Sequence, residues 1–435
     1  MFRKVSSLAL ERISAFGGMR RQSKKYSVIK VLEGFLSKRA KHKLINFGDV
    51  CMKKIIGFVV LLGLFAAQSF AGEQYSLQTA KEQVVNENIK VSIAYEQYVL
   101  VKSQARTKSL QLLPTLSVDM LIYDYQYAIL RTLVPEPSRF FEAAAQKDLA
   151  QAANVNRRIV QKNLLEDLEN TMFLFQYHNE MLESFKKEQA ITNEIAARSQ
   201  EAYDLGAIDF SEYYRTQRNV VSSKTQSVNG NELVKTEEFA LKLILQVKDN
   251  QEALGIDQLE FYNEGLDFPA TAEEATTIAV NNSKEVEQFD WMISAANKQK
   301  KGVALSWISW GGVGFDYFSR VSIAKHEVNK IELMKKKAIY EIKNQVVAQY
   351  SQIESQKQKI AYQAQLLDMA REEYAQAQAA QTDLLNSFIA TKKAELNVMY
   401  AEREASKLKY ELELKYIKLK RLIGANMITN EIPRS

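Results

Sequence analysis

The stretch IYEIKNQVVAQYSQIESQKQKIAYQAQLLDMAREEYAQA, residues 339–377, has the clearest periodicity of the sequence. Steps of alternately three and four residues select one apolar row and a second row that contains Gln three times in succession. Such a heptad pattern predicts a long helix that packs against another helix in a coiled coil. The selected positions are Ile339, Ile342, Val346, Gln349, Ile353, Gln356, Ile360, Gln363, Leu367, Ala370, Tyr374 and Ala377.

The glutamines of this seam, Gln349, Gln356 and Gln363, need hydrogen-bond partners. A buried amide without partners costs about 1–3 kcal/mol, so a dry two-helix core rarely accepts three stacked glutamines. We therefore expect a coiled coil with one dry edge and one edge in contact with water. The alternative is a solvated helix face on which the glutamines have no structural role.

The rest of the chain repeats this organisation weakly. Residues 80–91 are similar to residues 275–286, and the break at 203–212 is similar to the break at 374–383. Each copy has an opening helix, a segment of strand character, a very long helix and a returning helix. Turns are scarce, because 435 residues include only 16 Gly and 5 Pro. The predicted fold class is mainly α, with two repeats of long antiparallel coiled-coil hairpins and short β segments.

The repeat boundaries follow from these landmarks. The first repeat is expected over 72–268, with a long helix near 141–205, a tip near 204–211 and a return helix near 211–250. The second is expected over 269–424, with a tip near 375–382, a return helix near 382–422 and then a tail, 425–435. Ser211 and Thr382 are the predicted N-caps of the return helices. A rougher seam in the first long helix is formed by Leu168, Met172, Phe175, Leu182 and Phe185.

Two segments have strand character, about 115–130 and about 304–319. The first alternates aromatic and polar residues, and the second contains two Trp followed by a similar alternation. This pattern is typical of membrane strands with an aromatic girdle. A buried ribbon at the end of the helices is the alternative. The aromatic residues concerned are Tyr123, Tyr125, Tyr127, Trp307 and Trp310.

The N-terminal part resembles a targeting signal. Residues 52–71, MKKIIGFVVLLGLFAAQSFA, have the basic start, short apolar core and small-residue end of a secretory signal peptide, and 1–51 are interpreted as a mis-assigned start or a leader. Without the 14 Lys/Arg and three Asp/Glu of residues 1–71, the formal net charge falls from +6 to −5. The basic composition therefore does not indicate a nucleic-acid partner. Removal of Cys51 with this part leaves a chain without thiols.

The sequence lacks the groupings that enzymes use. After residue 71 there is no Cys, and the two histidines, His178 and His326, stand singly without ligand-spaced companions. The stretch 311–314 is rich in Gly but does not lead into a phosphate-binding helix. We expect no enzyme, no metal site and no cofactor.

At this point the sequence resembles the TolC family of outer-membrane efflux proteins. The similarity is carried by Ser76–Ala80 with Asn86-Glu-Asn88, by Ala275 with Asn281-Asn282, by Leu112-Leu-Pro114-Thr-Leu-Ser117, by Tyr203, Gly206 and Asp209, and by Leu422-Ile423-Gly424. Each motif is weak alone. In this order, twice over and behind a signal peptide, they are specific to the family and cover nearly all of the chain after residue 71.

The resemblance implies a homotrimer whose hairpins form a hollow α-helical tube across the periplasm and whose strands share one β-barrel in the lipid of the outer membrane. It implies efflux or type I secretion together with a periplasmic adaptor and an inner-membrane pump. By position, the periplasmic constriction would include Asp383, Asn386, Glu212 and Tyr374. The adaptor would contact the first tip through Leu205, Gly206, Ala207, Ile208 and Asp209.

One departure from the family pattern concerns strand length. Family members place two strands in each repeat, and a membrane strand needs about 9–11 residues. The segments 115–138 and 304–319 are too short for two full strands each, and Pro135 and Pro137 interrupt the first. We expect a shortened barrel part. The alternative function is that of a reduced TolC-like periplasmic coiled-coil protein with a structural or adaptor role.

Overall fold

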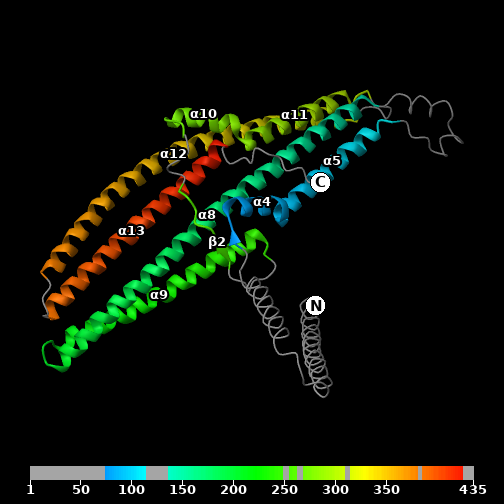
Figure 1. Ribbon diagram of the computed structural model, residues 1–435. Helices are drawn as coiled ribbons and strands as arrows, with labels where there is room; N and C mark the ends of the chain where they lie inside the picture. Colours follow the sequence, from blue (N-terminus) through cyan, green and yellow to red (C-terminus); the bar gives the residue numbers. More distant parts are fainter. Residues whose placement is uncertain are drawn as a thin grey trace, which may run out of the picture. The chain divides into compact units, whose positions relative to one another are not determined.

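The structure is a computed structural model that describes residues 74–113, 136–247, 254–261, 268–308, 314–380 and 385–424 (Figure 1). The chain divides into one unit of residues 1–71 and a second unit, Gly72–Ser435, to which all described residues belong. The predicted signal peptide therefore lies outside the described residues. So do the segment 115–130 with Tyr123, Tyr125 and Tyr127, and the tail 425–435.

The described unit contains two copies of one helical arrangement. Each copy has a short opening helix, a second helix, a very long helix and a long returning helix, in the predicted order. The first copy comprises α4 (Leu77–Glu87), α5 (Ile89–Leu110), α8 (Pro137–Asp204) and α9 (Phe210–Leu245), and the second α10 (Ala272–Asn282), α11 (Lys284–Leu305), α12 (Tyr317–Ala379) and α13 (Leu385–Ile423).

The helices lie side by side in a single layer. α8 packs against α5 and α11 over one half of its length and against α9 and α13 over the other half. α12 packs in turn against α11 and α13, so α12 forms one edge of the layer, and α5 with α9 forms the opposite edge (Figure 1). The strands β1 (Gln74–Tyr75) and β2 (Gly255–Ile256) form a short parallel pair beside the first copy.

The asparagines of the two repeated openings have the same structural role. The Asn88 side-chain amide donates to the carbonyl oxygen of Ile244 at 2.8 Å, and that of Asn282 donates to Ile423 at 3.2 Å. Both acceptors lie in the last turn of a returning helix, where carbonyl groups have no partner within the helix. The opening motif therefore fixes the end of each hairpin to the start of its own repeat.

The predicted helix ends are correct to within a few residues. α8 begins at Pro137, whose missing N–H is no loss in the first turn. The backbone of Gly206 has φ +73° directly after α8, a conformation that side chains disfavour. Ser211 is not the N-cap of α9. Asp209 is, because its carboxylate accepts the backbone N–H of Glu212 at 2.7 Å. Thr382 lies outside the described residues.

The described core has two main apolar clusters, one centred in each copy, and a smaller third cluster of Ile191, Ile195 and Ile389 between α8 and α13. The first is centred on Leu168, Met172 and Phe173 of α8, packed against α4, α9 and α13. The second is centred on Val346 and Ile353 of α12, packed against α10 and α13. Leu168, Met172 and Phe175 of the rougher seam therefore pack in the core as predicted, and Leu182 and Phe185 lie against Gly230 of α9.

The second strand prediction is wrong wherever the structure describes it. α11 extends to Leu305 and α12 begins at Tyr317, so both ends of the segment 304–319 are helical. Trp307 lies in the turn after α11, while Trp310 lies outside the described residues. The Tyr317 hydroxyl donates to the Ala304 carbonyl oxygen at 2.7 Å and joins the two helix ends. Alternation over a few residues did not distinguish a strand from a helix end.

Candidate functional site

The first hairpin tip is an exposed aromatic turn. Leu205 is 84% exposed, and Phe210 and Tyr214 are also exposed. The ring of Phe210 stacks on that of Tyr214 with 5.8 Å between centroids, and the ring of Tyr203 stacks on that of Tyr213 at 5.0 Å. Of the remaining residues predicted for this tip, Gly206, Ala207 and Asp209 are exposed and Ile208 is half-buried. The five therefore lie together at the accessible end of the first hairpin.

The second tip is described only in part. Asp383 lies outside the described residues, as does the side chain of Asn386. Tyr374 is half-buried on α12. The helices are joined near this tip by the Thr391 hydroxyl, which donates to the Ala377 carbonyl oxygen at 3.1 Å.

Glu212, the fourth predicted constriction residue, lies in the first turn of α9. Its carboxylate is 3.5 Å from the Arg215 guanidinium on the same helix. It also lines a cavity of about 190 Å³ between the two hairpins, close to both tips. The other walls of this cavity come from α8, α9 and α13 and include Glu188, Thr192, Thr216, Lys393 and Tyr400.

A buried ion pair borders this cavity. The Glu188 carboxylate accepts the Arg403 guanidinium at 2.6 Å and the Tyr400 hydroxyl at 3.0 Å, and only 5% of its side chain is exposed. Arg403 also donates to the Ser184 hydroxyl at 3.1 Å. Burial, and then the nearby Glu188 carboxylate, raises the pKa of Tyr400 to about 12. Tyr400 is therefore a neutral hydrogen-bond donor at any physiological pH.

This pair belongs to a polar seam between α8 and α13, which joins the two repeats. The carboxylates lie on α8 and their hydrogen-bond donors lie on α13. Because the two helices are antiparallel, acids later in α8 pair with donors earlier in α13. Burial raises the pKa of Glu166, although the Arg421 guanidinium opposes the effect. The pairs are Glu166 with Arg421 at 2.8 Å, Glu180 with Tyr410 at 2.6 Å, Glu188 with Arg403 at 2.6 Å and Glu194 with Lys392 at 2.9 Å.

The glutamine row of α12 is a ladder of hydrogen bonds to α13. The side-chain amides of Gln349, Gln356 and Gln363 donate to the carbonyl oxygens of Lys415, Leu408 and Ala401 at 2.9, 3.0 and 3.0 Å. Gln349 and Gln356 are each only 2% exposed. The predicted wetted edge is therefore wrong, and so is the alternative of a solvated face. The amides find the partners they need in the backbone of the facing helix.

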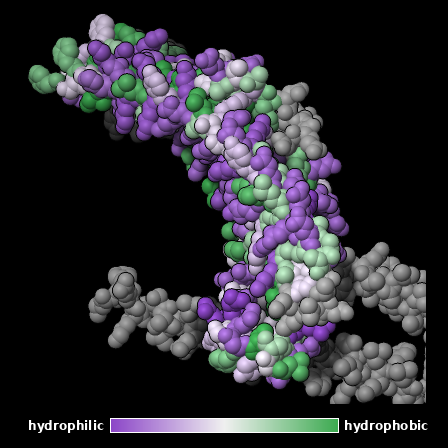
Figure 2. Space-filling model, turned by 90° about the vertical axis from the view of Figure 1, so that its left-hand side faces the viewer, coloured by the Kyte–Doolittle hydropathy of each residue, from purple (hydrophilic) through white to green (hydrophobic). Residues whose placement is uncertain are grey.

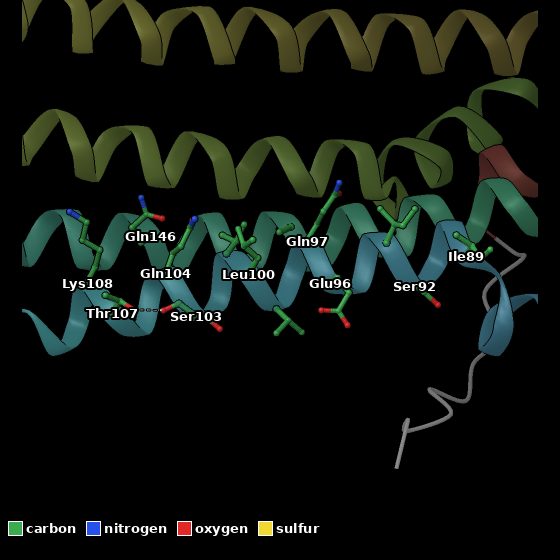
Figure 3. Close-up of a pocket in the computed structure, with 14 residues that line it drawn as sticks. Ile89, Ser92, Glu96, Gln97, Leu100, Ser103, Gln104, Thr107, Lys108 and Gln146 are labelled. Carbon is green, nitrogen blue, oxygen red and sulfur yellow. Dashed lines mark hydrogen bonds between the residues drawn. The ribbon is translucent and has the colours of Figure 1, made fainter. Parts of the chain in front are cut away.

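An apolar groove lies along α5, at one edge of the layer. It has a volume of about 1060 Å³ and is lined almost entirely by α5, with Gln146 and Ala153 of α8. Figure 3 shows Gln97, Leu100 and Gln104 along this helix, with Gln146 beside Gln104. Ile89, Ile93 and Leu100 are exposed there.

α12, at the opposite edge, carries a second apolar row that faces no helix of the described chain. Figure 2 shows a face of the molecule on which hydrophilic side chains predominate and hydrophobic ones are interspersed. Leu333, Tyr340 and Val347 are exposed at intervals of one heptad, and Tyr362 and Met369 continue the row. This row is distinct from the seam that packs on α13. Each edge of the layer therefore exposes apolar residues at helical spacing.

The sequence contains a signal for the polar seam, but the search for apolar heptads did not find it. Glu166, Glu180 and Glu194 recur every 14 residues along one face of α8. Such a row of acids suits a cationic partner helix, but nothing local identifies α13 as that helix. Among the described residues there is no group of three or more His, Cys, Asp or Glu that could hold a metal ion. No described helix has both the length and the apolar character that crossing a membrane requires.

Comparisons with known proteins give a likeness in structure and none in sequence. No protein-family model and no curated protein matches the sequence. The structure is similar to the Neisseria gonorrhoeae MtrE outer membrane channel in its open state, with a TM-score of 0.64 and 11% identity over 80% of this chain and 88% of that one.

Two further solved structures show the same similarity. The Campylobacter jejuni CmeC outer membrane channel gives a TM-score of 0.59 and 13% identity over 80% of this chain and 85% of that one. A membrane protein from Pseudomonas aeruginosa gives 0.67 and 11% identity, over 80% and 90%. The chain therefore has a TolC-like fold, and the fold expected from the sequence resemblance is confirmed.

Proposed function

We propose that this chain is a subunit of a TolC-like outer-membrane efflux channel. In this proposal three copies form a helical tube that extends from the outer membrane into the periplasm and receives substrates from an inner-membrane pump through an adaptor. The observation that carries the proposal is the shared fold, which extends over 80% of this chain and 85–90% of each of the three neighbours described above. The exposed apolar row of α12 and the apolar groove along α5 add support.

The two edges of the layer support assembly with further copies. α12 exposes its apolar row on one side, and α5 exposes its groove on the other. The two surfaces differ, so a contact between them is head-to-tail, and such contacts close into a ring when the rotation fits. A ring buries both apolar edges and leaves no end copy with an exposed stripe. Among rings of different numbers of copies, the similarity in fold favours the homotrimer.

The tips support contact with an adaptor. Leu205, Phe210 and Tyr214 form an exposed apolar surface on a turn that Gly206 and Asp209 hold in place. Exposed aromatic side chains at the end of a rod are typical of a protein contact. In the proposal Asp383, Asn386, Glu212 and Tyr374 narrow the entrance beside these tips, and a ring of carboxylates there favours cations.

Cell fractionation and planar-bilayer recording test the proposal on the protein isolated from cells. We expect a trimer in the detergent extract of the outer membrane and discrete conductance steps from that trimer in a bilayer. Asp383→Ala is expected to raise the conductance, while Gln352→Glu, an exposed change on α12, leaves it unaltered. Release of the protein with the soluble periplasm would favour the structural coiled-coil protein instead.

A further inference from the structure

A small cavity lies at the N-terminal end of α11. It has a volume of about 190 Å³, and its walls come from α8, α11, α12 and α13. Ser283, the N-cap of α11, is buried in the wall, while Glu341 and Gln345 of α12 are exposed, so the cavity opens to the surface beside α12. At about 30 Å³ per water molecule, it has room for about six waters, or for one molecule of about six non-hydrogen atoms.

Lys162 of α8 lines this cavity and has no close partner in the chain around it. The residue is only 7% exposed, and its ammonium forms no hydrogen bond or ion pair with any described residue. Burial, the largest effect, lowers the pKa of Lys162, although the more distant Glu285 carboxylate opposes burial. Lysine is almost never buried to this extent without a counter-ion, because a buried charge without one is costly. The partner of this ammonium is therefore to be sought in the cavity.

Arg421, the other cation in the wall, is already bound. Its guanidinium lies 2.8 Å from the Glu166 carboxylate and donates to the Asn163 side-chain oxygen at 2.6 Å. Lys162 is therefore the cation of this cavity that remains available to a ligand.

Glu285 brings negative charge to the same cavity. Its carboxylate accepts the Ser283 hydroxyl at 3.0 Å and lies 3.9 Å from the Arg421 guanidinium. Burial acts to raise the pKa of Glu285, but the Lys162 ammonium and the hydrogen bonds of Glu285 outweigh burial and lower it. Glu285 is therefore ionised at neutral pH, and Glu341 adds a second carboxylate at the opening.

We propose that this cavity binds a small α-amino acid in its zwitterionic form. The α-carboxylate accepts a hydrogen bond from Lys162, the α-ammonium group donates to Glu285 and Glu341, and the side chain of the ligand contacts the apolar part of the wall, formed by Ala338, Ile342 and Leu422. An inorganic anion would suit Lys162 but would be repelled by the two carboxylates. A simple amine would leave Lys162 unpaired.

Alanine is the matching probe, because its six non-hydrogen atoms fit the volume and its two charges fit the two signs of the wall. The ligand would contact α8 of the first copy together with α11 and α12 of the second, so its binding stabilises the packing of one copy on the other. This binding does not depend on the proposed channel.

Isothermal titration calorimetry with alanine tests the proposal on the protein isolated from cells. We expect one alanine to bind to each chain. Propionate is alanine without its amino group, and ethylamine is alanine without its carboxylate. Each should bind at least about tenfold more weakly than alanine, because each leaves a charge of the cavity unpaired.

Two variants locate the site. Lys162→Met should weaken alanine binding by at least about tenfold, while the melting temperature without alanine stays the same or rises, because a buried charge without a close partner is removed. Glu341→Gln, at an exposed position that folding does not require, should weaken binding about threefold. The matched controls are Lys187→Met on α8 and Glu354→Gln on α12, both exposed outside the cavity, and both should leave binding unaltered.

Three outcomes would overturn the proposal. Absence of alanine binding to the unaltered chain would mean that the cavity holds water only. Equal binding of propionate and alanine would indicate a site for anions. Alanine binding that persists in Lys162→Met would place the ligand elsewhere, and if that variant does not fold, undiminished binding in Glu341→Gln would be decisive in the same way.

Discussion

Glu188 shows how a single charged side chain is held between the two hairpins. Its carboxylate is bound by Arg403 and Tyr400 of α13, and the amide of Gln226 of α9, turned with its nitrogen toward Glu188, lies 3.0 and 3.2 Å from its two oxygens. A buried charge that loses its partner is strongly destabilising, whereas removal of both partners is often tolerated.

Removal of one partner of the Glu188–Arg403 pair should therefore lower the free energy of unfolding more than removal of both partners does. We expect Arg403→Met to lower the free energy of unfolding by about 3 kcal/mol, and the double variant with Glu188→Gln to recover at least half of that loss. Arg371→Met is the matched control, because the Arg371–Glu402 pair is half exposed at 3.0 Å and is worth less than about 1 kcal/mol. Denaturant unfolding measures all four proteins. Equal losses in both Arg variants would contradict the argument.

His178 is a second buried titratable group between helices. Its Nδ1 has no hydrogen-bond partner among the described residues and lies 3.8 Å from the Glu237 carboxylate of α9. Burial lowers the pKa of His178 and raises the pKa of Glu237. Below the ordinary histidine pKa of 6.5 the unfolded chain binds a proton at His178 more readily than the folded chain does. The folded state therefore loses stability as the pH falls below 6.5.

His178→Leu should remove this part of the acid sensitivity. We expect the melting temperature to fall less between pH 8 and pH 5.5 in the variant than in the wild type. The raised pKa of Glu237 acts with the opposite sign, closer to pH 4.5, and is present in both proteins. His326→Leu, at an exposed position on α12, is the control and should behave as the wild type does. An identical fall in all three would contradict the assignment.

The α12–α13 hairpin combines an apolar row with the glutamine ladder. Successive rungs lie seven residues further along α12 and bind carbonyl oxygens seven residues nearer the start of α13, so the ladder matches the heptads of both antiparallel helices. Apolar heptads alone allow one helix to slip by a full repeat against the other. Polar groups with fixed partners at core positions oppose such slips, which is their best-attested role in coiled coils.

One substitution removes an amide donor from the ladder while it keeps the size of the side chain. Gln349→Glu keeps the side-chain length but turns a carboxylate toward the Lys415 carbonyl oxygen, where it cannot donate. We expect a loss of about 2–3 kcal/mol in the free energy of unfolding at pH 8. Gln352→Glu introduces the same charge at an exposed position of the same helix and should cost less than about 0.5 kcal/mol. Chemical denaturation followed by circular dichroism compares the two, and similar losses would refute the ladder.

The complete layer of helices has two apolar edges that no other described element covers. α12 exposes Tyr340 and Val347, and α5 exposes Ile93 and Leu100. Apolar rows of this length are unfavourable in water, so the layer gains free energy when copies associate edge to edge.

Charges placed in the α12 row should therefore prevent assembly without unfolding the chain. We expect Tyr340→Glu with Val347→Glu to convert the proposed trimer into monomers of unchanged helical content. The double variant Gln352→Glu with Lys359→Glu adds carboxylates to exposed positions outside the row and should remain trimeric. Light scattering coupled to size-exclusion chromatography gives the mass. A trimer that survives the first change would move the contact to another surface.

The local features of this fold could be predicted from the sequence. Heptad spacing predicted α12, weak self-similarity predicted the two repeats, and Gly206 marked the first tip two residues after the end of α8. These features are local because the helical period and the cost of a turn depend on neighbouring residues only. The strand expected around Trp307 failed for the same reason, since a few alternating residues also fit the end of a helix.

The partners of the polar groups were decided by the tertiary structure alone. The acids of α8 and the glutamines of α12 were visible in the sequence, but their partners lie on α13, which is far from α8 along the chain and adjacent to it in space. The hydrophobic period of a helix sequence shows which face of that helix is buried. Only the packing of the whole layer determines which helix supplies the opposite face, and therefore whether a buried charge or amide finds its hydrogen bond.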